Sequence, residues 1–192
     1  MGEHVAYCIG TQDSPDSCLG VEVLKGDDHI ARLASDGFSR AFVAIGSNEI
    51  RGKLAALAVE NGFVLVNAIS PMAFISPSAS IGQGVAIMAG VVINASSHIG
   101  DLSIINTGAV VDHDCQIGYA THIGPQSALA GNVRVDDYAF LGIGAKVIPG
   151  VTIGKSAIIG AGSVVLKDVR EFVTVAGVPA KRLKNSGSEL SE

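Results

Sequence analysis

An aliphatic residue recurs every six positions along nearly half of the chain, starting at Ile75 and ending at Val165. A second, mostly small residue stands four positions after each of them, from Ala79 to Val169. Sixteen consecutive hexads obey both rules. A period of six suits neither an amphipathic helix nor the alternating pattern of a hairpin. The aliphatic series is Ile75, Ile81, Ile87, Ile93, Ile99, Ile105, Val111, Ile117, Ile123, Leu129, Val135, Leu141, Val147, Ile153, Ile159 and Val165.

This period predicts a coil of three short strands, in which each hexad supplies one flat side and one corner. Three hexads complete a coil, and successive coils stack at about 4.8 Å, the usual distance between paired strands. The aliphatic and small positions both point inward, so the prediction is a triangular β prism of a little over five coils. Glycine often follows the aliphatic position, which we attribute to unusual φ or to close packing at the corners. These glycines are Gly82, Gly100, Gly118, Gly124, Gly142, Gly154 and Gly160.

The first 74 residues lack this repeat and predict a small α/β domain. We therefore divide the chain into an acceptor- or nucleotide-binding domain at 1–74, a β-helical domain at 75–170 and a C-terminal tail at 171–192. In the first domain the pattern predicts strands at Val5–Ile9, Val21–Leu24, Ala41–Ile45 and Phe63–Val66, and helices at Asp28–Ser35 and Glu49–Asn61.

The turn between the predicted strand Ala41–Ile45 and the helix after it reads Gly46-Ser47-Asn48. A strand, a glycine turn, an N-cap residue and a helix together present backbone amides that can bind a phosphate. Most such turns only cap a helix, so both interpretations stay open. Asp13, in the loop after the first strand, is a further candidate for contacts to a base or ribose, although loop acids are commonly just solvated.

Composition narrows the classes of function. Of the 192 residues, 48% are hydrophobic and 16% charged, which is enough apolar surface for a core. The net charge of −5 provides no basic field for a nucleic acid. Polar residues interrupt every apolar run, and the first residues lack the basic start and long apolar centre of a signal peptide, so we expect no membrane insertion and a cytoplasmic protein. The three cysteines form no CxxC pair, and we expect reduced thiols.

His113 is the first residue that the repeat does not require. It takes the third hexad position, at a corner, with Asp112 and Asp114 on either side. An exposed imidazole near acid keeps a pKa close to neutrality and can act as a general base. Cys115 lies nearby but holds a small inward position, which favours core packing over a role as nucleophile.

The run from Ile105 to Cys115 resembles the sugar acetyltransferases of bacterial nucleotide-amino-sugar pathways and the related sialic acid acetyltransferases, which belong to the hexapeptide-repeat acyltransferases. Further matching motifs lie in the segments 44–51, 122–125, 130–133, 140–145 and 177–181. The resemblance implies a mainly β fold, a left-handed parallel β-helix of hexapeptide repeats preceded by a small, shortened α/β Rossmann-like domain. It also implies homotrimers with active sites between subunits, and acetyl-CoA as co-substrate without a metal.

Carried over residue by residue, the resemblance makes His113 the general base and Asp114 the acid that orients or polarises it. Gly131, one coil above His113, supplies the backbone donor to the acetyl carbonyl, and Asn106 and His122 line the same cleft. Gly46, Ser47, Asn48 and Asp13 become acceptor-binding candidates. The implied CoA-binding residues are Gly142, Gly144, Gly160, Ala161, Gly162, Lys167 and Lys181.

The predicted reaction is therefore acetyl transfer from acetyl-CoA to the 4-amino group of a nucleotide-linked sugar. A sugar hydroxyl, as in sialic acid, is the alternative acceptor, and a free amino sugar or a non-catalytic scaffold stays open. The family's glycine-rich turn, Gly-x-Gly-Gly-His-Gly, is not found ahead of Val5–Gly10, which leaves open a different acceptor site, an acceptor without a nucleotide, or a truncated start. A zinc-dependent carbonic anhydrase is disfavoured because no H-x4-H pair is present.

Overall fold

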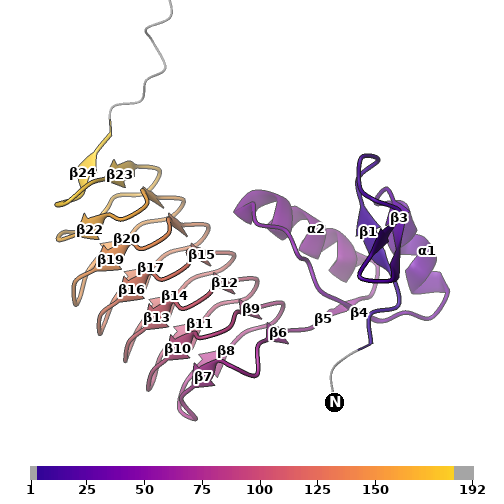
Figure 1. The fold of residues 1–192 in the computed structure, drawn as a ribbon, viewed down its shortest axis with the longest axis horizontal. Coiled ribbons are helices and arrows are strands. Elements are labelled where there is room, and N and C mark those ends of the chain that lie inside the picture. The colour runs from indigo at the N-terminus through magenta and orange to yellow at the C-terminus, as the bar shows by residue number, and fades with distance from the viewer. Residues whose placement is uncertain (1–3, 184–192) are drawn as a thin grey trace, which may run out of the picture. The chain divides into compact units, whose positions relative to one another are not determined.

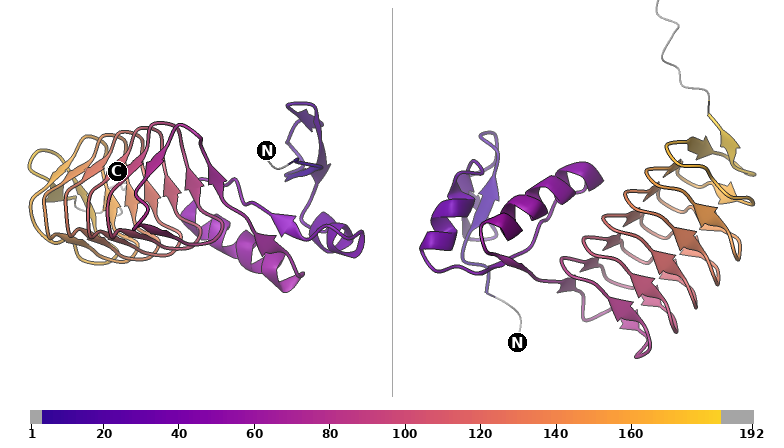
Figure 2. Two further views of the ribbon diagram at one scale, coloured as in Figure 1. Left: turned by 90° about the horizontal axis from the view of Figure 1, so that it is seen from below. Right: turned by 180° about the vertical axis from the view of Figure 1, so that it is seen from behind.

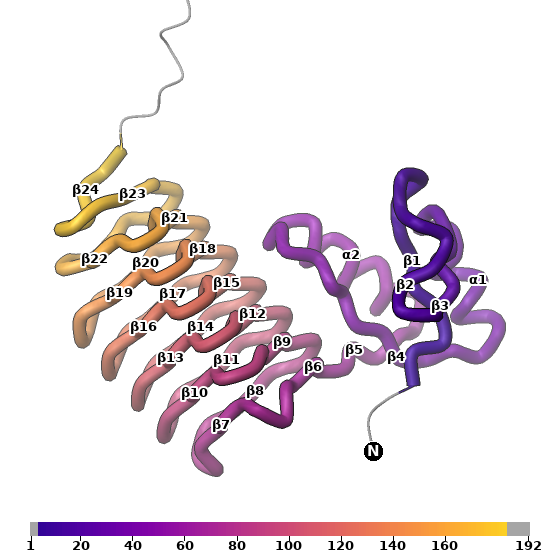
Figure 3. Tube along the Cα trace, viewed as in Figure 1, coloured from indigo at the N-terminus to yellow at the C-terminus, as the bar shows by residue number. Residues whose placement is uncertain are grey.

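The computed structural model describes residues 4–183. They form two compact units, one made of the chain up to Ala41 with Ala56–Val64, the other of Phe42–Ala55 with the chain from Leu65 onward. Figure 1 labels the elements of both units, and the tube in Figure 3 follows the chain through them. No helix in the described part of the chain is long and apolar enough to cross a membrane.

The first unit is a small α/β assembly. Strand β3 (Val21–Lys25) pairs in parallel with β1 (Cys8–Gly10) and antiparallel with β2 (Ser17–Cys18). The helix α1 (His29–Ser35) follows and buries Ile30 and Leu33. Strands β4 (Arg40–Ala41) and β5 (Val64–Leu65) form a separate two-stranded sheet. These two sheets are not joined into the single parallel sheet that a Rossmann-like domain would contain.

The helix α2 spans Asn48–Glu60, close to the predicted Glu49–Asn61. The predicted strand Ala41–Ile45 is largely wrong, because only Ala41 belongs to β4. Val43 packs instead in a cluster with Ala55 of α2 and with Leu102 of the β-helix, and all three residues belong to the second unit. The apolar run is therefore used to attach the chain to the β-helix and not to extend a sheet.

The second unit is a parallel β-helix with three sheets, and its stacked coils are clearest in Figure 1 and in the right-hand view of Figure 2. The first sheet contains β7 Phe74–Ile75, β10 Val92–Ile93, β13 Val110–Val111, β16 Ala128–Leu129, β19 Lys146–Val147 and β22 Val164–Val165. The second contains β8 Ser80–Ile81, β11 His98–Ile99, β14 Gln116–Ile117, β17 Arg134–Val135 and β20 Thr152–Ile153. The third contains β6 Ala68–Ile69, β9 Ala86–Ile87, β12 Ile104–Ile105, β15 His122–Ile123, β18 Phe140–Leu141, β21 Ile158–Ile159, β23 Thr174–Ala176 and β24 Lys181–Arg182.

The register of the sheets is the one the repeat predicts. Val92 pairs with Val110 and Val110 with Ala128, so residues one coil apart are neighbours. The coil starts one strand before the repeat does, since β6 already pairs with β9. At the other end β24 runs antiparallel to β23, within the predicted tail. The polar end of that tail, 184–192, lies outside the described residues.

The core of the β-helix consists of the two inward positions of each hexad, as predicted. Ile105, Val111 and Ile123 are inaccessible to solvent, and so are Ala109 and Cys115 at the small position. Some small positions carry hydroxyls that stay satisfied: the Ser103 hydroxyl donates to the Gly118 carbonyl. A column of small residues therefore lets the three sheets approach closely without leaving buried polar groups unpaired.

Glycine after the aliphatic position is explained by close packing and not by φ. A Cβ on Gly100 would lie 2.8 Å from the backbone of Gly118, and one on Gly142 would lie 2.7 Å from the Ala161 nitrogen. The left-handed φ values occur two residues further on, for example at Gly144 and at Asp114. Asp and Asn tolerate that conformation better than most residues, so the corner can carry a carboxylate.

Candidate active site

The first sheet presents an apolar outer surface, which we call the apolar face. Its outward residues are Phe74, Val92, Val110, Ala128, Lys146 and Val164. The second sheet instead turns polar residues outward, among them Ser80, Gln116 and Arg134. Two chemically distinctive corners border the apolar face, one at the start of strand β13 and one at its end.

The corner after β13 carries the predicted base and its neighbour. The His113 Nδ1 lies 2.7 Å from Asp114 Oδ2, and both side chains are about half exposed. Asp114 has φ of 59°, in the left-handed region. The Asp114 carboxylate thus reaches the ring. A carboxylate at Nδ1 selects the tautomer that has its proton there, which leaves Nε2 free to accept a proton.

Asp112, on the other side of His113, contacts other groups than the ring. Its Oδ1 accepts hydrogen bonds from Asn94 Nδ2 at 2.9 Å and from the backbone N–H of His113 at 2.8 Å. These two donors lower the pKa of Asp112. Asp112 therefore shapes the corner, whereas Asp114 is the carboxylate that contacts the imidazole.

Both carboxylates favour the protonated ring. The hydrogen bond to Asp114 is the largest cause that raises the pKa of His113, followed by the charge of Asp112, and desolvation opposes them. His113 therefore binds a proton more tightly than a free imidazole. That is the property of a base which must stabilise the imidazolium it forms.

Gly131 lies directly against the His113 ring, one coil further on. A Cβ on Gly131 would lie 2.5 Å from both Cε1 and Nε2 of His113. The backbone N–H of Asn132 donates to the His113 carbonyl at 3.0 Å, which fixes this stacking. Within residues 4–183 the Gly131 N–H makes no hydrogen bond, so a donor is available next to the imidazole.

The corner before β13 holds the other predicted cleft residues. Thr107 N–H donates to Asn106 Oδ1 at 2.8 Å, so the Asn106 amide nitrogen faces His122 Nε2 at 3.1 Å. Nε2 is then the acceptor and the proton sits on Nδ1, an assignment made from this network. His122 packs edge to face against Phe140, with ring centroids 5.2 Å apart. Burial lowers the pKa of His122 and so favours its neutral form.

The turn before α2 belongs to the same unit as these corners. Ser47 caps the helix weakly, with its hydroxyl 3.5 Å from the Ile50 N–H. Gly46 has no atom within 4 Å of the place where a Cβ would lie. The Asn48 side chain is occupied, since Nδ2 donates to the carbonyls of Tyr138 and Ala139. Contacts from this turn to a ligand would therefore come from its backbone.

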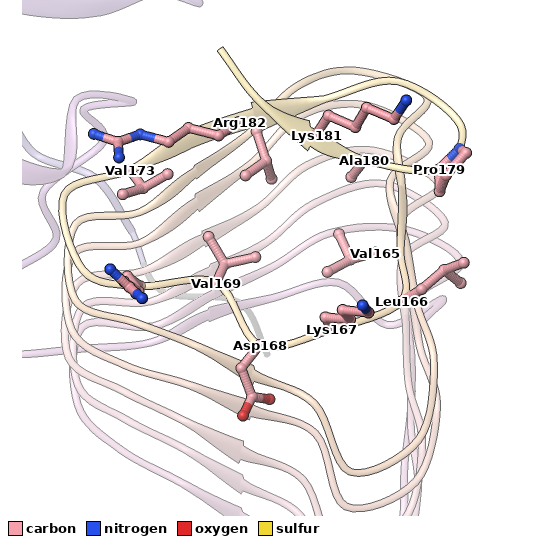
Figure 4. Close-up of a pocket in the computed structure, with 12 residues that line it drawn as sticks. Val165, Leu166, Lys167, Asp168, Val169, Val173, Pro179, Ala180, Lys181 and Arg182 are labelled. Carbon is pink, nitrogen blue, oxygen red and sulfur yellow. The ribbon is translucent and has the colours of Figure 1, made fainter. Parts of the chain in front are cut away.

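The predicted CoA-binding residues fall into two groups. Gly142, Gly144, Gly160 and Ala161 follow strands of the third sheet and continue the Asn106 corner in later coils. Lys167 and Lys181 lie instead at the C-terminal end of the β-helix, where they line a cavity together with Arg182 (Figure 4). Asp13 belongs to the first unit and is exposed.

One chain therefore brings the predicted site residues together in two separate groups, which we call half-sites. His113, Asp114 and Gly131 meet at one edge of the apolar face, and Asn106 meets His122 at the opposite edge. Among the residues that the structure describes, no group of three or more His, Cys, Asp or Glu side chains could hold a metal ion.

Arg51 was missed by sequence reasoning. It is 1% exposed, and its guanidinium hydrogen-bonds to two coils of the β-helix. A signal was present in the sequence, because Arg51 shares one helical face with Ala55 and Ala58, both of which are buried. An arginine at the start of a buried helix face that is otherwise lined by small residues needs polar groups to bind its charge, so it indicates a specific hydrogen-bond partner.

Known proteins share this architecture. The crystal structure of PerB from Caulobacter crescentus, in complex with CoA and GDP-perosamine, is 58% identical, with a TM-score of 0.87 over 88% of this chain and 82% of that one. The acetyltransferase domain of PglB from Neisseria gonorrhoeae, in complex with acetyl coenzyme A, is 38% identical, with a TM-score of 0.85 over 90% and 84%.

Sequence comparison agrees. A GDP-perosamine N-acetyltransferase of Escherichia coli O157:H7 is 34% identical over 77% of this chain and 69% of its own. The chain spans only 43% to 56% of the serine acetyltransferases that it matches from Buchnera aphidicola, Bacillus licheniformis and Bacillus pumilus. The family model described as bacterial transferase hexapeptide (six repeats) matches residues 132–167. The predicted fold class, a left-handed parallel β-helix, is thus confirmed, and the chain belongs to the hexapeptide-repeat transferase family.

Proposed function

We propose that this protein is an acetyl-CoA-dependent N-acetyltransferase that acts on a nucleotide-linked 4-amino sugar, with GDP-perosamine as the first candidate acceptor. The observation that carries the proposal is the corner where His113 contacts Asp114 and lies against the unpaired Gly131 N–H. The complex of the Caulobacter relative with CoA and GDP-perosamine supports the choice of both substrates.

In this proposal His113 acts as the base. Asp114 accepts a hydrogen bond from Nδ1–H and fixes the ring, so Nε2 takes the proton that the acceptor amine loses as its nitrogen bonds to the acetyl carbonyl carbon. The Gly131 N–H donates to the carbonyl oxygen as negative charge develops on it. The C–S bond then breaks, and CoA leaves as the thiolate or, once protonated, as the thiol. No covalent enzyme intermediate is required, and Cys115 stays in the core.

The two half-sites favour a homotrimer with active sites between subunits. The apolar face separates the His113 corner from the Asn106 corner, so packing these faces around a threefold axis would bring His113 of one subunit toward His122 of the next. Exposed apolar surface of this kind is a typical interaction site. The glycines at 142, 144 and 160 continue the Asn106 corner, along which we place CoA.

Breaking the apolar face should separate the subunits. We expect Val110→Arg to shift the protein from trimer to monomer and to abolish most activity, because a charged side chain would be buried in the interface. Multi-angle light scattering measures the mass. Gln116→Arg, on the polar second sheet, is the matched control and should leave both mass and turnover unchanged. A fully active monomeric Val110→Arg protein would contradict the shared site.

Substrate identity is tested by product analysis. Thiol release from acetyl-CoA is followed with GDP-, UDP- and dTDP-linked amino sugars, free amino sugars, sialic acids and serine, and the products are identified by mass spectrometry and NMR. We expect turnover of GDP-perosamine with one acetyl group on its amine. Acetylation of a hydroxyl acceptor, with no nucleotide sugar consumed, would contradict the proposal.

The role of Asp114 predicts a specific change in pH dependence. Since Asp114 raises the pKa of His113, activity is lost as pH falls through that raised value. Asp114→Asn removes the charge, so the acidic limb of the kcat/KM profile should move to lower pH. The plateau should fall about ten- to a hundredfold, the range for a lost hydrogen bond to a charged group. Asp136→Asn, a carboxylate paired with Arg134 at another corner, should change neither the limb nor the plateau.

A further inference from the structure

Arg51 is a buried cation without a carboxylate partner in residues 4–183. Burial lowers its pKa to about 10, so it stays charged at neutral pH. Its acceptors are all neutral oxygens, and Nε donates to the Leu102 carbonyl at 2.7 Å. One terminal nitrogen donates to the carbonyls of Ile45 at 2.9 Å and Gly46 at 3.2 Å. The other terminal nitrogen donates to Asn48 Oδ1 at 2.8 Å, to the Ala120 carbonyl at 3.0 Å and to the Thr121 carbonyl at 3.1 Å. Buried charges are normally paired, so this arrangement needs a reason.

These acceptors come from three separate pieces of the chain. Ile45 and Gly46 belong to the turn before α2, whereas Leu102 and Ala120 occupy the same corner position in two successive coils. The planar fork of a guanidinium can bind all of them at once, which a single ammonium nitrogen cannot. Arg51 therefore attaches the turn to the two coils of the β-helix that contain Leu102 and Ala120.

His122 lies next to these contacts of Arg51 along the chain. Thr121, whose carbonyl accepts from Arg51, is the residue before it. His122 Nδ1 is buried without a hydrogen-bond partner in the described residues, and its other nitrogen faces Asn106. Phe140 packs against the ring, the backbone of Gly46 raises the pKa of His122, and the charge of Arg51 lowers that pKa after the larger effect of burial.

We propose that Arg51 is the positioning residue of the acceptor side of the active site, where its guanidinium holds the Ile45–Gly46 turn beside His122. This inference rests on the proposed function for its kinetic consequence only. The backbone of the turn and the His122 ring then form one prearranged surface for the acceptor. The charge of Arg51 also lowers the pKa of His122, after the larger effect of burial, so the ring keeps its neutral, Nδ1-protonated form.

Arg51→Lys and Arg51→Met separate geometry from charge. Lysine keeps the positive charge but loses the fork, and methionine keeps the aliphatic volume but loses the charge. We expect both variants to raise KM for the nucleotide sugar about tenfold, the effect of one misplaced hydrogen-bonding group. KM for acetyl-CoA should stay within about twofold, because its proposed binding corner does not contact Arg51. Arg134→Met, at an exposed arginine on the second sheet, is the matched control and should change neither constant.

A second readout needs no substrate. The titration of the His122 ring is followed by NMR with labelled histidine, assigned through a His122→Gln variant. We expect Arg51→Met to raise the pKa of His122, because a repulsive cation is removed, and Arg51→Lys to leave the pKa nearer the wild-type value. Thermal unfolding identifies any variant that does not fold, and Arg51→Lys alone then decides the question.

The outcomes separate the two proposals. If the wild-type protein turns over no nucleotide sugar, the proposed function fails, while the His122 titration still tests Arg51. If Arg51→Lys folds and keeps the wild-type KM for the acceptor, the positioning role is wrong. An unchanged His122 pKa in folded Arg51→Met also overturns the role, because the cation would then not act on that ring.

Discussion

Replacing His113 with alanine should lower kcat by about two to four orders of magnitude, the usual contribution of a positioned general base. The ring is about half exposed and makes its side-chain contact with Asp114, so its loss should leave the fold of the β-helix intact. KM for both substrates should change little, because His113 acts on the proton that moves in the reaction. Single-turnover kinetics with acetyl-CoA and the nucleotide sugar measures the chemical step directly.

His98→Ala is the matched control for this variant. His98 is also an exposed histidine on the β-helix, but it lies on the second sheet and contacts Ser80. Its removal should leave kcat unchanged. Full turnover by His113→Ala, with CoA binding intact, would remove His113 from the mechanism and leave the corner without a base.

The prism could be predicted because its physics is local and repeated. Each hexad needs one aliphatic and one small inward side chain, so sixteen copies of the pattern determine register, core and corners together. Outside the repeat, an apolar run reports burial but not the partner that buries it. Phe42–Ile45 is apolar like a strand, yet Val43 packs against the corner of the β-helix, and the strand prediction failed there.

The site was predictable only in part for a related reason. His113 stood out because the repeat does not require it, and its stacking against Gly131 follows from the length of one coil. The contact between Asp114 and the ring depends on the left-handed backbone at Asp114, which the residue type permits but does not dictate. The helical spacing of Arg51 with Ala55 and Ala58 indicates that Arg51 is buried, but it does not identify the oxygens that Arg51 contacts, because they come from distant parts of the chain.

Gly131→Ala should reduce kcat/KM about a hundredfold without removing any functional group. The added Cβ would meet Cε1 and Nε2 of His113 at 2.5 Å, so the ring must move away from the donor beside it. Displacement of a catalytic group by about 1 Å commonly costs about that factor. The backbone itself tolerates alanine, since Ala95 holds the same hexad position two coils earlier and Gly131 has no left-handed φ.

The double variant His113→Ala with Gly131→Ala tests this explanation. Without the imidazole the new methyl group has room, so Gly131→Ala should cost almost nothing further in kcat/KM or in melting temperature once His113 is gone. Contacting residues give such non-additivity, and independent ones do not. If the two losses multiply instead, the methyl group acts elsewhere, and the stacking of Gly131 on the imidazole is not what the reaction requires.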